Sequence, residues 1–355
     1  MCVMIDLKKG YAMNKQSKWI YLWALLVMLL IVVASLLLGT IDVPVLGAFK
    51  SLLQVLGLAS DQVTYLTPEQ TAAFWYLRMP RILVGLLVGG ALALAGTVMQ
   101  GLFSNPLADP GILGLSSGAG LGAILALVTG ATTLSYWAMP AFALVGAFVT
   151  LLVAIAITLR GGRINPSILL LAGLAVSLFC GALTSGLLTT LPDLQVKTFL
   201  FWMIGGLEAR HWSHVAMGLG PILVAGAILL ILGRQLNVMA LGDVEAKALG
   251  LPVTAYRVLF IFLASILTAT AVCMSGTIGF VGLVVPHIMR RLVGPDHRRL
   301  LPAAAIGGAS FLVACDTLGR LMPFAGEVRV GVVTALVGAP YFLYLLYGMR
   351  KGGRL

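Results

Sequence analysis

Apolar stretches of about 20 residues recur along the whole chain, which is the length an α-helix needs to cross the core of a bilayer. Only 10% of the 355 residues are charged, whereas soluble domains carry roughly 25%. The stretches are too long and too uniformly apolar for the strands of an outer-membrane barrel. The sequence therefore predicts an all-α polytopic membrane protein that lies in the lipid bilayer.

Ten membrane-spanning helices are expected per subunit. They are predicted near residues 19–39, 82–101, 112–130, 138–159, 167–190, 214–233, 254–275, 278–290, 301–318 and 329–348. Pro80 is well placed to begin the second of these helices. This division predicts a cytoplasmic segment at residues 1–18, a transmembrane domain over 19–348 and a cytoplasmic tail at 349–355.

The net charge of +11 would suggest nucleic acid as the partner of a soluble protein, but here it fits the positive-inside rule. With ten spans, both termini and most of the basic clusters fall on one side of the membrane, so we expect both termini in the cytoplasm and no nucleic-acid partner. The clusters are Lys8, Lys9, Lys15 and Lys18; Arg160 and Arg163; Arg234 and Lys247; Arg290, Arg291, Arg298 and Arg299; and Arg350, Lys351 and Arg354.

Arg78, Arg81 and Arg320 are exceptions, because the topology places them at outer helix ends. They could snorkel to the interface. Three arginines at one face also suit docking of an acidic partner, since the guanidinium fork binds a carboxylate with two hydrogen bonds. Asp316 is the main intramembrane charge, and its spacing from Arg320 predicts a local ion pair.

Motifs for catalysis or metal binding are weak. No lysine follows a glycine, so the chain has no P-loop of its own for ATP. The segment "GLSSG" matches GxSxG only formally, because a nucleophile elbow needs an α/β sheet. Neither His211 with His214 nor the four scattered cysteines forms a metal-binding motif, so no metal site and no cofactor are expected in this chain.

Glycines recur at a spacing of four in two segments. Gly114, Gly118 and Gly122 form one set, and Gly85 and Gly89 form another. Small residues at this spacing let helix backbones approach closely, which serves packing and also suits a bundle that moves.

The segment "LGDVEAKALGLPV" predicts a short amphipathic helix within a cytoplasmic region at about residues 237–253. Asp243 is expected at the N-cap or in the first turn, where it could pair with Lys247, and Gly250 should end the helix. The apolar face is expected to consist of Val244, Ala248 and Leu249. Such a helix is either a solvated surface turn or a docking site for a cytoplasmic partner.

The blocks "LRMPRILVGLLVGGALALAGTVMQGLFSNPLADPGILGLSSGAGLGA", "SGTIGFVGLVVPHIMR" and "GVVTALVGAPYFLYLL" resemble the FecCD-type permeases. These are membrane subunits of ABC importers for iron-siderophores, haem and vitamin B12. The resemblance runs from about Arg78 to Tyr347. It implies a homodimer of ten-span subunits around a central translocation pathway, completed by two cytoplasmic ATPase subunits that bind ATP-Mg and by a periplasmic substrate-binding protein.

The resemblance also implies roles for individual residues. Arg78, Arg81 and Arg320 would receive acidic residues of the binding protein. Asn105 and Leu107 would form one cytoplasmic gate, and Pro166 and Ser167 the other, although Pro166 stands where the family can have a small hydroxyl residue. The ATPase-coupling residues would be Asp243, Val244, Glu245, Ala246, Lys247, Ala248, Leu249 and Gly250.

For the cargo, the tract from "TPEQTAAFWYLRMPR" through "GAGLGAILALVTGA" is most similar to haem-importer permeases, which places haem before ferric siderophore and vitamin B12. His211 and His214 are candidates for the substrate pathway. Two other classes stay open. An ion-driven secondary transporter would need buried charges at mid-membrane, and an intramembrane hydrolase would need Ser116 or Ser117 to meet His287.

Overall fold

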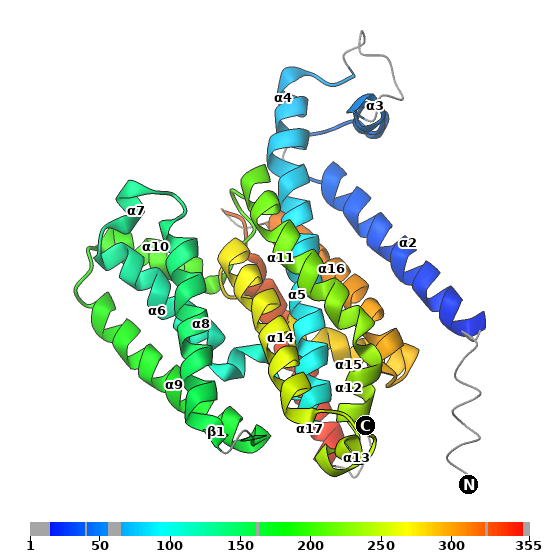
Figure 1. The fold of residues 1–355 in the computed structure, drawn as a ribbon. Helices are drawn as coiled ribbons and strands as arrows, with labels where there is room; N and C mark the ends of the chain where they lie inside the picture. Colours follow the sequence, from blue (N-terminus) through cyan, green and yellow to red (C-terminus); the bar gives the residue numbers. More distant parts are fainter. Residues whose placement is uncertain (1–14, 40, 56–64, 161–162, 324–325, 351–355) are drawn as a thin grey trace.

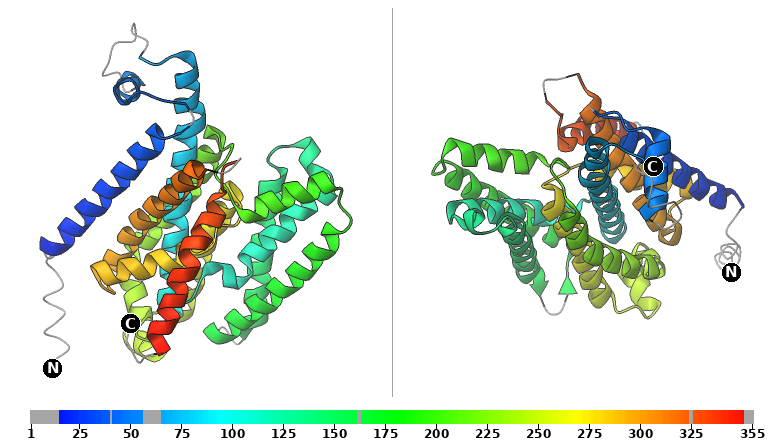
Figure 2. Two further views of the ribbon diagram at one scale, coloured as in Figure 1. Left: turned by 180° about the vertical axis from the view of Figure 1, so that it is seen from behind. Right: turned by 90° about the horizontal axis from the view of Figure 1, so that it is seen from above.

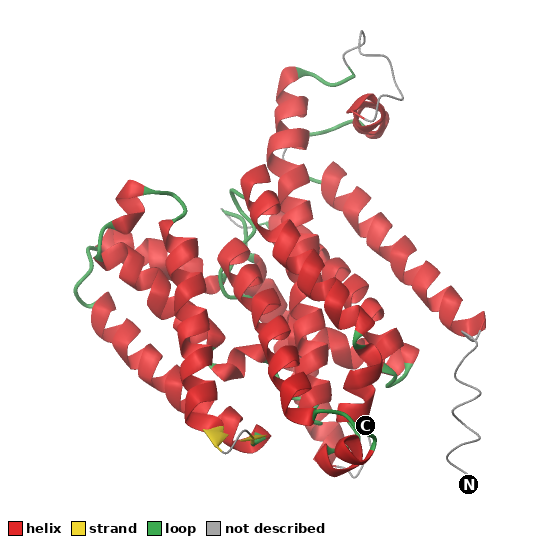
Figure 3. Cartoon of the chain, viewed as in Figure 1, coloured by secondary structure: helices red, strands yellow, loops and turns green. Residues whose placement is uncertain are grey.

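The computed structural model describes residues 15–39, 41–55, 65–160, 163–323 and 326–350, and there it is built of helices apart from two strands of two residues each (Figures 1 and 3). Residues 1–14 and 351–355 of the predicted terminal segments lie outside this range. The elements are α2 Lys15–Leu37, α3 Val45–Val55, α4 Pro68–Thr71, the π-helix η1 Ala72–Arg78, α5 Met79–Leu102, the 3-10 helix η2 Pro110–Leu113, α6 Leu115–Val128, α7 Ala131–Leu134, α8 Ala138–Thr158, β1 Leu159–Arg160, β2 Arg163–Ile164, α9 Pro166–Leu188, α10 Asp193–Ile204, α11 Trp212–Ile231, α12 Gly233–Met239, α13 Asp243–Ala248, α14 Val253–Ser275, α15 Val281–Val293, α16 His297–Leu321 and α17 Val330–Arg350.

The predicted all-α membrane architecture is confirmed. Within the described residues, seven helical segments are long and apolar enough to cross a membrane: α2, the continuous run from α4 through α5, α8, α9, α11, α14 and α16. The other three predicted spans fall on α6 (14 residues), α15 (13 residues) and α17. A total of ten spans therefore stays a prediction.

Pro80 lies in the first turn of α5, as expected, but α5 continues an earlier helical segment, so the whole run begins before Pro80. The helical run starts at Pro68, where Thr67 and Gln70 form a capping box by accepting each other's backbone N–H. Proline has no N–H to donate inside a helix. Just before Pro80 the helix widens into η1, and the Met79 N–H donates to Phe74 O, five residues back. The helix thereby continues through the proline.

The bundle has two groups of helices (Figure 1). In one, α5 packs against α11, α14, α15 and α16; in the other, α6 packs against α8 and α9, and contacts of α14 with α8 join the groups. The apolar stretches of α5 and α14 are each 78% buried, whereas that of α2 is only 11% buried. Helices α5 and α14 therefore form the centre of the bundle. Helix α2 lies along the outside with large apolar side chains exposed, as expected of a helix that faces lipid.

Figure 1 shows α3, α4 and α7 at one end of the molecule and α13 and β1 at the other. The described part of the chain begins and ends toward the second end, which the view from behind in Figure 2 also shows for α2 and α17. This arrangement agrees with an even number of crossings. We call these the outer end and the inner end, following the predicted topology.

Glycines bring α6 and α8 into backbone contact. A Cβ atom at Gly122 would lie 2.0 Å from Phe142 O, and one at Gly118 would lie 2.5 Å from Gly146 O. These distances are too short for any side chain, so the predicted close approach is present at both positions. Gly114 has a different function from the one expected: it precedes α6 with φ of +89°, in the left-handed region that glycine favours.

Candidate functional site

A cavity of about 570 Å³ opens near the outer end, between the start of α5, the α10–α11 connection, the end of α16 and the start of α17. We call it the arginine cavity. Its lining side chains include five arginines and two glutamates: Arg78, Arg81, Arg210, Arg320 and Arg329, with Glu208 and Glu327. The three arginines that the sequence singled out therefore come together in one place.

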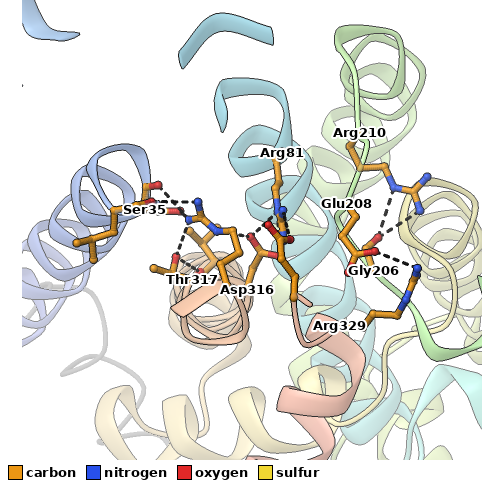
Figure 4. A network of polar contacts seen from close by, with 12 residues as sticks. Ser35, Arg81, Gly206, Glu208, Arg210, Asp316, Thr317 and Arg329 are labelled. Atoms are coloured by element: carbon orange, nitrogen blue, oxygen red, sulfur yellow. Dashed lines mark hydrogen bonds and ion pairs between the residues drawn. The ribbon is translucent and has the colours of Figure 1, made fainter. Parts of the chain in front are cut away.

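Asp316 organises the arginines beside this cavity (Figure 4). Its carboxylate accepts from Arg81 Nε at 2.9 Å and from Arg81 Nη2 at 2.8 Å, while Arg320 Nε lies 3.5 Å away on its other side. The predicted pairing with Arg320 is present, but the closer contact is with Arg81. Arg81 also donates to Glu327 at 2.7 Å.

Arg78 is buried and its guanidinium is used within the chain. It donates to the carbonyl oxygens of Leu36 and Leu37, at 2.6 and 3.0 Å, and to that of Ile41. The end of α2 leaves carbonyl groups without helical partners, and Arg78 satisfies two of them. This contact holds α2 against the start of α5.

Two further arginines of the cavity were missed at the sequence level. Arg329 pairs with Glu208 at 2.9 Å and stacks over Phe201 at 4.5 Å. Arg210 donates to Gly206 O at 3.2 Å, and among the described residues no carboxylate pairs with it. Burial lowers the pKa of Arg210. The sequence offered one indication of these two arginines: in "LEARHW" and in "GEVRVG" an acidic residue stands two positions before the arginine.

His211 and His214 lie at the start of α11 and do not form a pair of free ligands. His211 N–H donates to His214 Nδ1 at 3.2 Å, and His214 Nε2 lies 3.2 Å from Tyr136 Oη and 3.4 Å from Arg210 Nη1. His214 is only 1% exposed. Its nitrogens are thus used inside the protein, while His211 is exposed.

At the inner end, the chain turns sharply between α5 and η2. Asn105 Oδ1 accepts from the Leu107 N–H at 2.9 Å, and the Asn105 N–H donates to Gln100 O at 3.1 Å. Ser104 before it adopts φ of +46°. We call residues 104–109 the first gate turn, after the gate that is expected there from the sequence. It lies beside a cavity of about 990 Å³ that Asn105 and Pro106 help to line.

Asp109 ends the first gate turn and was not among the predicted site residues. Its carboxylate accepts from the Gly111 N–H at 2.7 Å and so caps η2. Burial raises the pKa of this carboxyl, although the hydrogen bond from the Gly111 amide opposes the shift. The "ADPG" order was the available signal, because Asp before Pro is typical of a helix start.

The second gate turn, residues 165–167, follows the β1–β2 hairpin. In that hairpin the two strands pair antiparallel, with Leu159 opposite Ile164. Asn165 caps α9 by accepting from the Ser167 N–H at 3.0 Å, and Pro166 occupies the first helical position. Pro166 therefore starts the helix, and Ser167 is exposed beside it.

The predicted inner helix is present as α13. Asp243 lies in its first turn, one of the two places expected for it, and the N-cap is Gly242, with φ of +116°. Two other expectations need correction. Asp243 pairs with Arg257 of α14, not with Lys247, because Arg257 is fixed by burial next to it. The expected apolar face points outward: Val244 is 76% exposed and Leu249 66%, whereas the buried residue is Ala246.

The alternative chemistries find no support in the described part of the chain. No group of three or more His, Cys, Asp or Glu side chains could hold a metal ion there. His287 is buried against Tyr341, and no hydrogen bond joins it to Ser116 or Ser117. Cys180, Cys273 and Cys315 are buried free thiols.

Residues 26–348 match the model of the FecCD transport family. The chain belongs to this family. It is thus an integral inner-membrane protein and a permease subunit of an ABC importer, not itself the ATPase, and nothing supports an ion-driven transporter.

Three curated relatives are similar over most of the chain. The cobalamin import system permease protein BtuC of Halobacterium salinarum is 43% identical over 76% of this chain and 72% of its own. The hemin transport system permease protein HmuU of Yersinia pestis is 42% identical over 86% of this chain and 96% of its own. The vitamin B12 import system permease protein BtuC of Escherichia coli is 39% identical over 81% of this chain and 87% of its own.

One solved structure extends the comparison to the fold. It is an inward-facing metal-chelate type ABC transporter, with a TM-score of 0.81 and 32% sequence identity over 93% of this chain and 99% of that chain. The permease fold is therefore shared over nearly the whole chain, while the names of the relatives divide between two cargoes.

Proposed function

We propose that the chain is the permease of a haem importer in a bacterial inner membrane. In this proposal two copies form a homodimer around a central pathway, a periplasmic binding protein delivers haem, and two cytoplasmic ATPase subunits supply ATP-Mg. The observation that carries the choice of haem is the match to 96% of the hemin permease's own length. Cobalamin is the main alternative, because relatives named for it are about as similar, and ferric siderophore is the third.

Uptake decides between the cargoes. The permease would be purified with its co-purifying ATPase and binding protein and placed in proteoliposomes. We expect ATP-dependent uptake of haem in excess over cobalamin and over a ferric siderophore. Uptake of cobalamin or siderophore alone would overturn the cargo assignment. Uptake by the chain without ATPase or ATP would overturn the importer mechanism.

The arginine cavity supports docking of an acidic binding protein at the outer end. Its arginines outnumber its glutamates, and a cleft lined by one sign of charge attracts the opposite charge. Arg78, Arg81 and Arg320 use their guanidinium groups largely for hydrogen bonds within the chain. In this proposal they contribute mainly to the positive electrostatic potential of the cavity and to holding its helices in place. Arg210, which pairs with no carboxylate among the described residues, is the strongest candidate for direct contact with an acidic side chain.

Charge reversal at Arg210 tests this docking. Arg210→Glu is expected to weaken binding of the periplasmic protein at least tenfold, about 1.4 kcal/mol, and to reduce its dependence on salt. Lys50→Glu is the matched control, because Lys50 lies on α3 at the same end but does not line the cavity. Equal affinities of wild type and Arg210→Glu would refute docking at this cavity.

We also propose ten spans with both termini in the cytoplasm, in which α6, α15 and α17 add to the seven long helical segments. Leu134 on α7 is 89% exposed at one end, and Val244 on α13 is 76% exposed at the other. In intact spheroplasts that lack the ATPase, a membrane-impermeant maleimide should label Leu134→Cys but not Val244→Cys. The reverse pattern would contradict the orientation.

A further inference from the structure

Arg257 joins two segments of the inner end that are far apart in the sequence. It lies in the first turns of α14 and is only 3% exposed. One arm of its guanidinium, Nη2, pairs with Asp243 of α13, and the other, Nη1, donates to Ile164 O of β2 at 2.8 Å. A single buried side chain therefore contacts both the hairpin and α13. Figure 1 shows the lower end of α14 near both β1 and α13.

The contact at Ile164 leads directly to the second gate turn. Ile164 is 2% exposed, and the next residue is Asn165, which caps α9. Asn165 Oδ1 accepts from the Ser167 N–H, and Asn165 O accepts from the Leu169 N–H. Only Asn165 and Pro166 separate Ile164 from Ser167, and Asn165 is bonded to the first turn of α9, so we expect a displacement of Ile164 to move the start of α9.

The contact at Asp243 leads to the exposed surface of α13. This helix is bounded by Gly242 and Gly250, both with positive φ, and it is anchored by buried Ala246 and by the Leu251 N–H bond to Ala246 O. Val244 and Leu249 project outward. We expect a partner that pushes on these apolar side chains to move α13 as a unit. The ion pair of Asp243 with Arg257 would then transmit this movement to Arg257.

We propose that Arg257 couples α13 to the second gate turn, so that movement of α13 by the ATPase is converted into opening and closing at Ser167. This inference rests on the proposed function. Arginine suits the task because its planar fork holds two partners in fixed directions, which lysine cannot do. Among the described residues, Arg257 Nε has no hydrogen-bond partner, so the two arms carry the polar contacts of the guanidinium.

The test compares Arg257→Lys and Arg257→Met with wild type in the complete complex of permease, ATPase and binding protein. We expect both variants to assemble with the ATPase, while the number of cargo molecules moved per ATP hydrolysed falls at least tenfold. In a Ser167→Cys background, the ATP-dependent change in maleimide labelling should disappear. A residue with only a structural function would lower complex yield or the thermal midpoint without changing either readout in the surviving complex.

Two further variants keep the test decisive. Asp243→Asn weakens the same link from a half-exposed position, and it should also uncouple if the Arg257 variants fail to assemble. Combined with Arg257→Met it should cause little additional loss, because both changes remove one interaction. Arg298→Gln is the matched control: it removes the Arg298–Asp296 ion pair, 3.0 Å long, which does not involve the hairpin.

Unchanged transport per ATP in the Arg257 variants, or an unchanged labelling response, would overturn the inference. A wild-type complex that moves no cargo with ATP would instead overturn the proposed function.

Discussion

Arg81 of α5 and Asp316 of α16 form a bidentate ion pair between two neighbouring helices, with 2.9 Å from Nε to Oδ2 and 2.8 Å from Nη2 to Oδ1. The Asp316 side chain is 3% exposed, and Arg320 approaches it from its own helix. One buried carboxylate therefore balances two of the arginines that line the arginine cavity.

Removing this carboxylate should destabilise the permease. Asp316→Asn leaves Arg81 and Arg320 without their buried counter-charge, and breaking one partner of a buried pair costs about 3 kcal/mol. We expect a clearly lower midpoint of thermal unfolding, followed by fluorescence-detected size-exclusion chromatography. Glu327→Gln is the control, because the Glu327 side chain is 44% exposed and exposed pairs contribute about 0–1 kcal/mol. Equal midpoints for the two variants would contradict this account.

Adding a methyl group between α6 and α8 should also be costly. A Cβ at Gly122 would lie 2.0 Å from Phe142 O, so Gly122→Ala must push the helices apart, at about 1–3 kcal/mol. Gly220→Ala is the matched control, since nothing lies within 4 Å of its added Cβ and alanine favours a helix by about 0.5–1 kcal/mol over glycine. The same thermal assay should show opposite signs for the two variants, and a stable Gly122→Ala protein would exclude the tight packing.

The first gate turn depends on the side-chain oxygen of Asn105. Asn105→Ala removes the acceptor of the Leu107 N–H, whereas Asn105→Asp keeps an acceptor in the same place. In proteoliposomes loaded with cargo, we expect Asn105→Ala to leak severalfold faster without ATP, and Asn105→Asp to leak like wild type. Identical leak rates for all three proteins would show that this turn does not close the pathway.

Asp296 gives a prediction for pH. Burial alone would raise its pKa, but hydrogen bonds from Arg298 and Asn237 prevail and lower the pKa to about 2, below the ordinary 3.8. The folded state thus favours the carboxylate, so its stabilising effect is complete above about pH 4 and is lost as pH falls through 2. The difference in thermal midpoint between wild type and Asp296→Asn should be constant from pH 5 to 8 and shrink below 4. A difference that grows on acidification would contradict the assignment.

Hydrophobic patterning predicted most of the fold because a bilayer-spanning helix must satisfy its backbone internally and present apolar side chains to lipid. That constraint is local, so α2, α8, α9, α11 and α14 fall close to their expected ranges. Hydrophobic patterning says little about where a helix begins when its first turns lie outside the bilayer. The extension of α5 through η1 back to Pro68 was therefore not predicted. The patterning also says little about a span as short as α15.

The sequence by itself determined the family, the helical membrane architecture and the positions of both gate turns and α13, since these depend on local apolar length and on short motifs. Only the tertiary structure decided the partners. Asp316 meets Arg81, Asp243 meets Arg257, and Arg210 and Arg329 join the arginine cavity. Each of these contacts joins segments whose separation depends on how the chain packs. A buried charge pairs most closely with the partner that packing brings nearest, as Asp316 does with Arg81 at 2.8 Å, compared with 3.5 Å for Arg320 of its own helix.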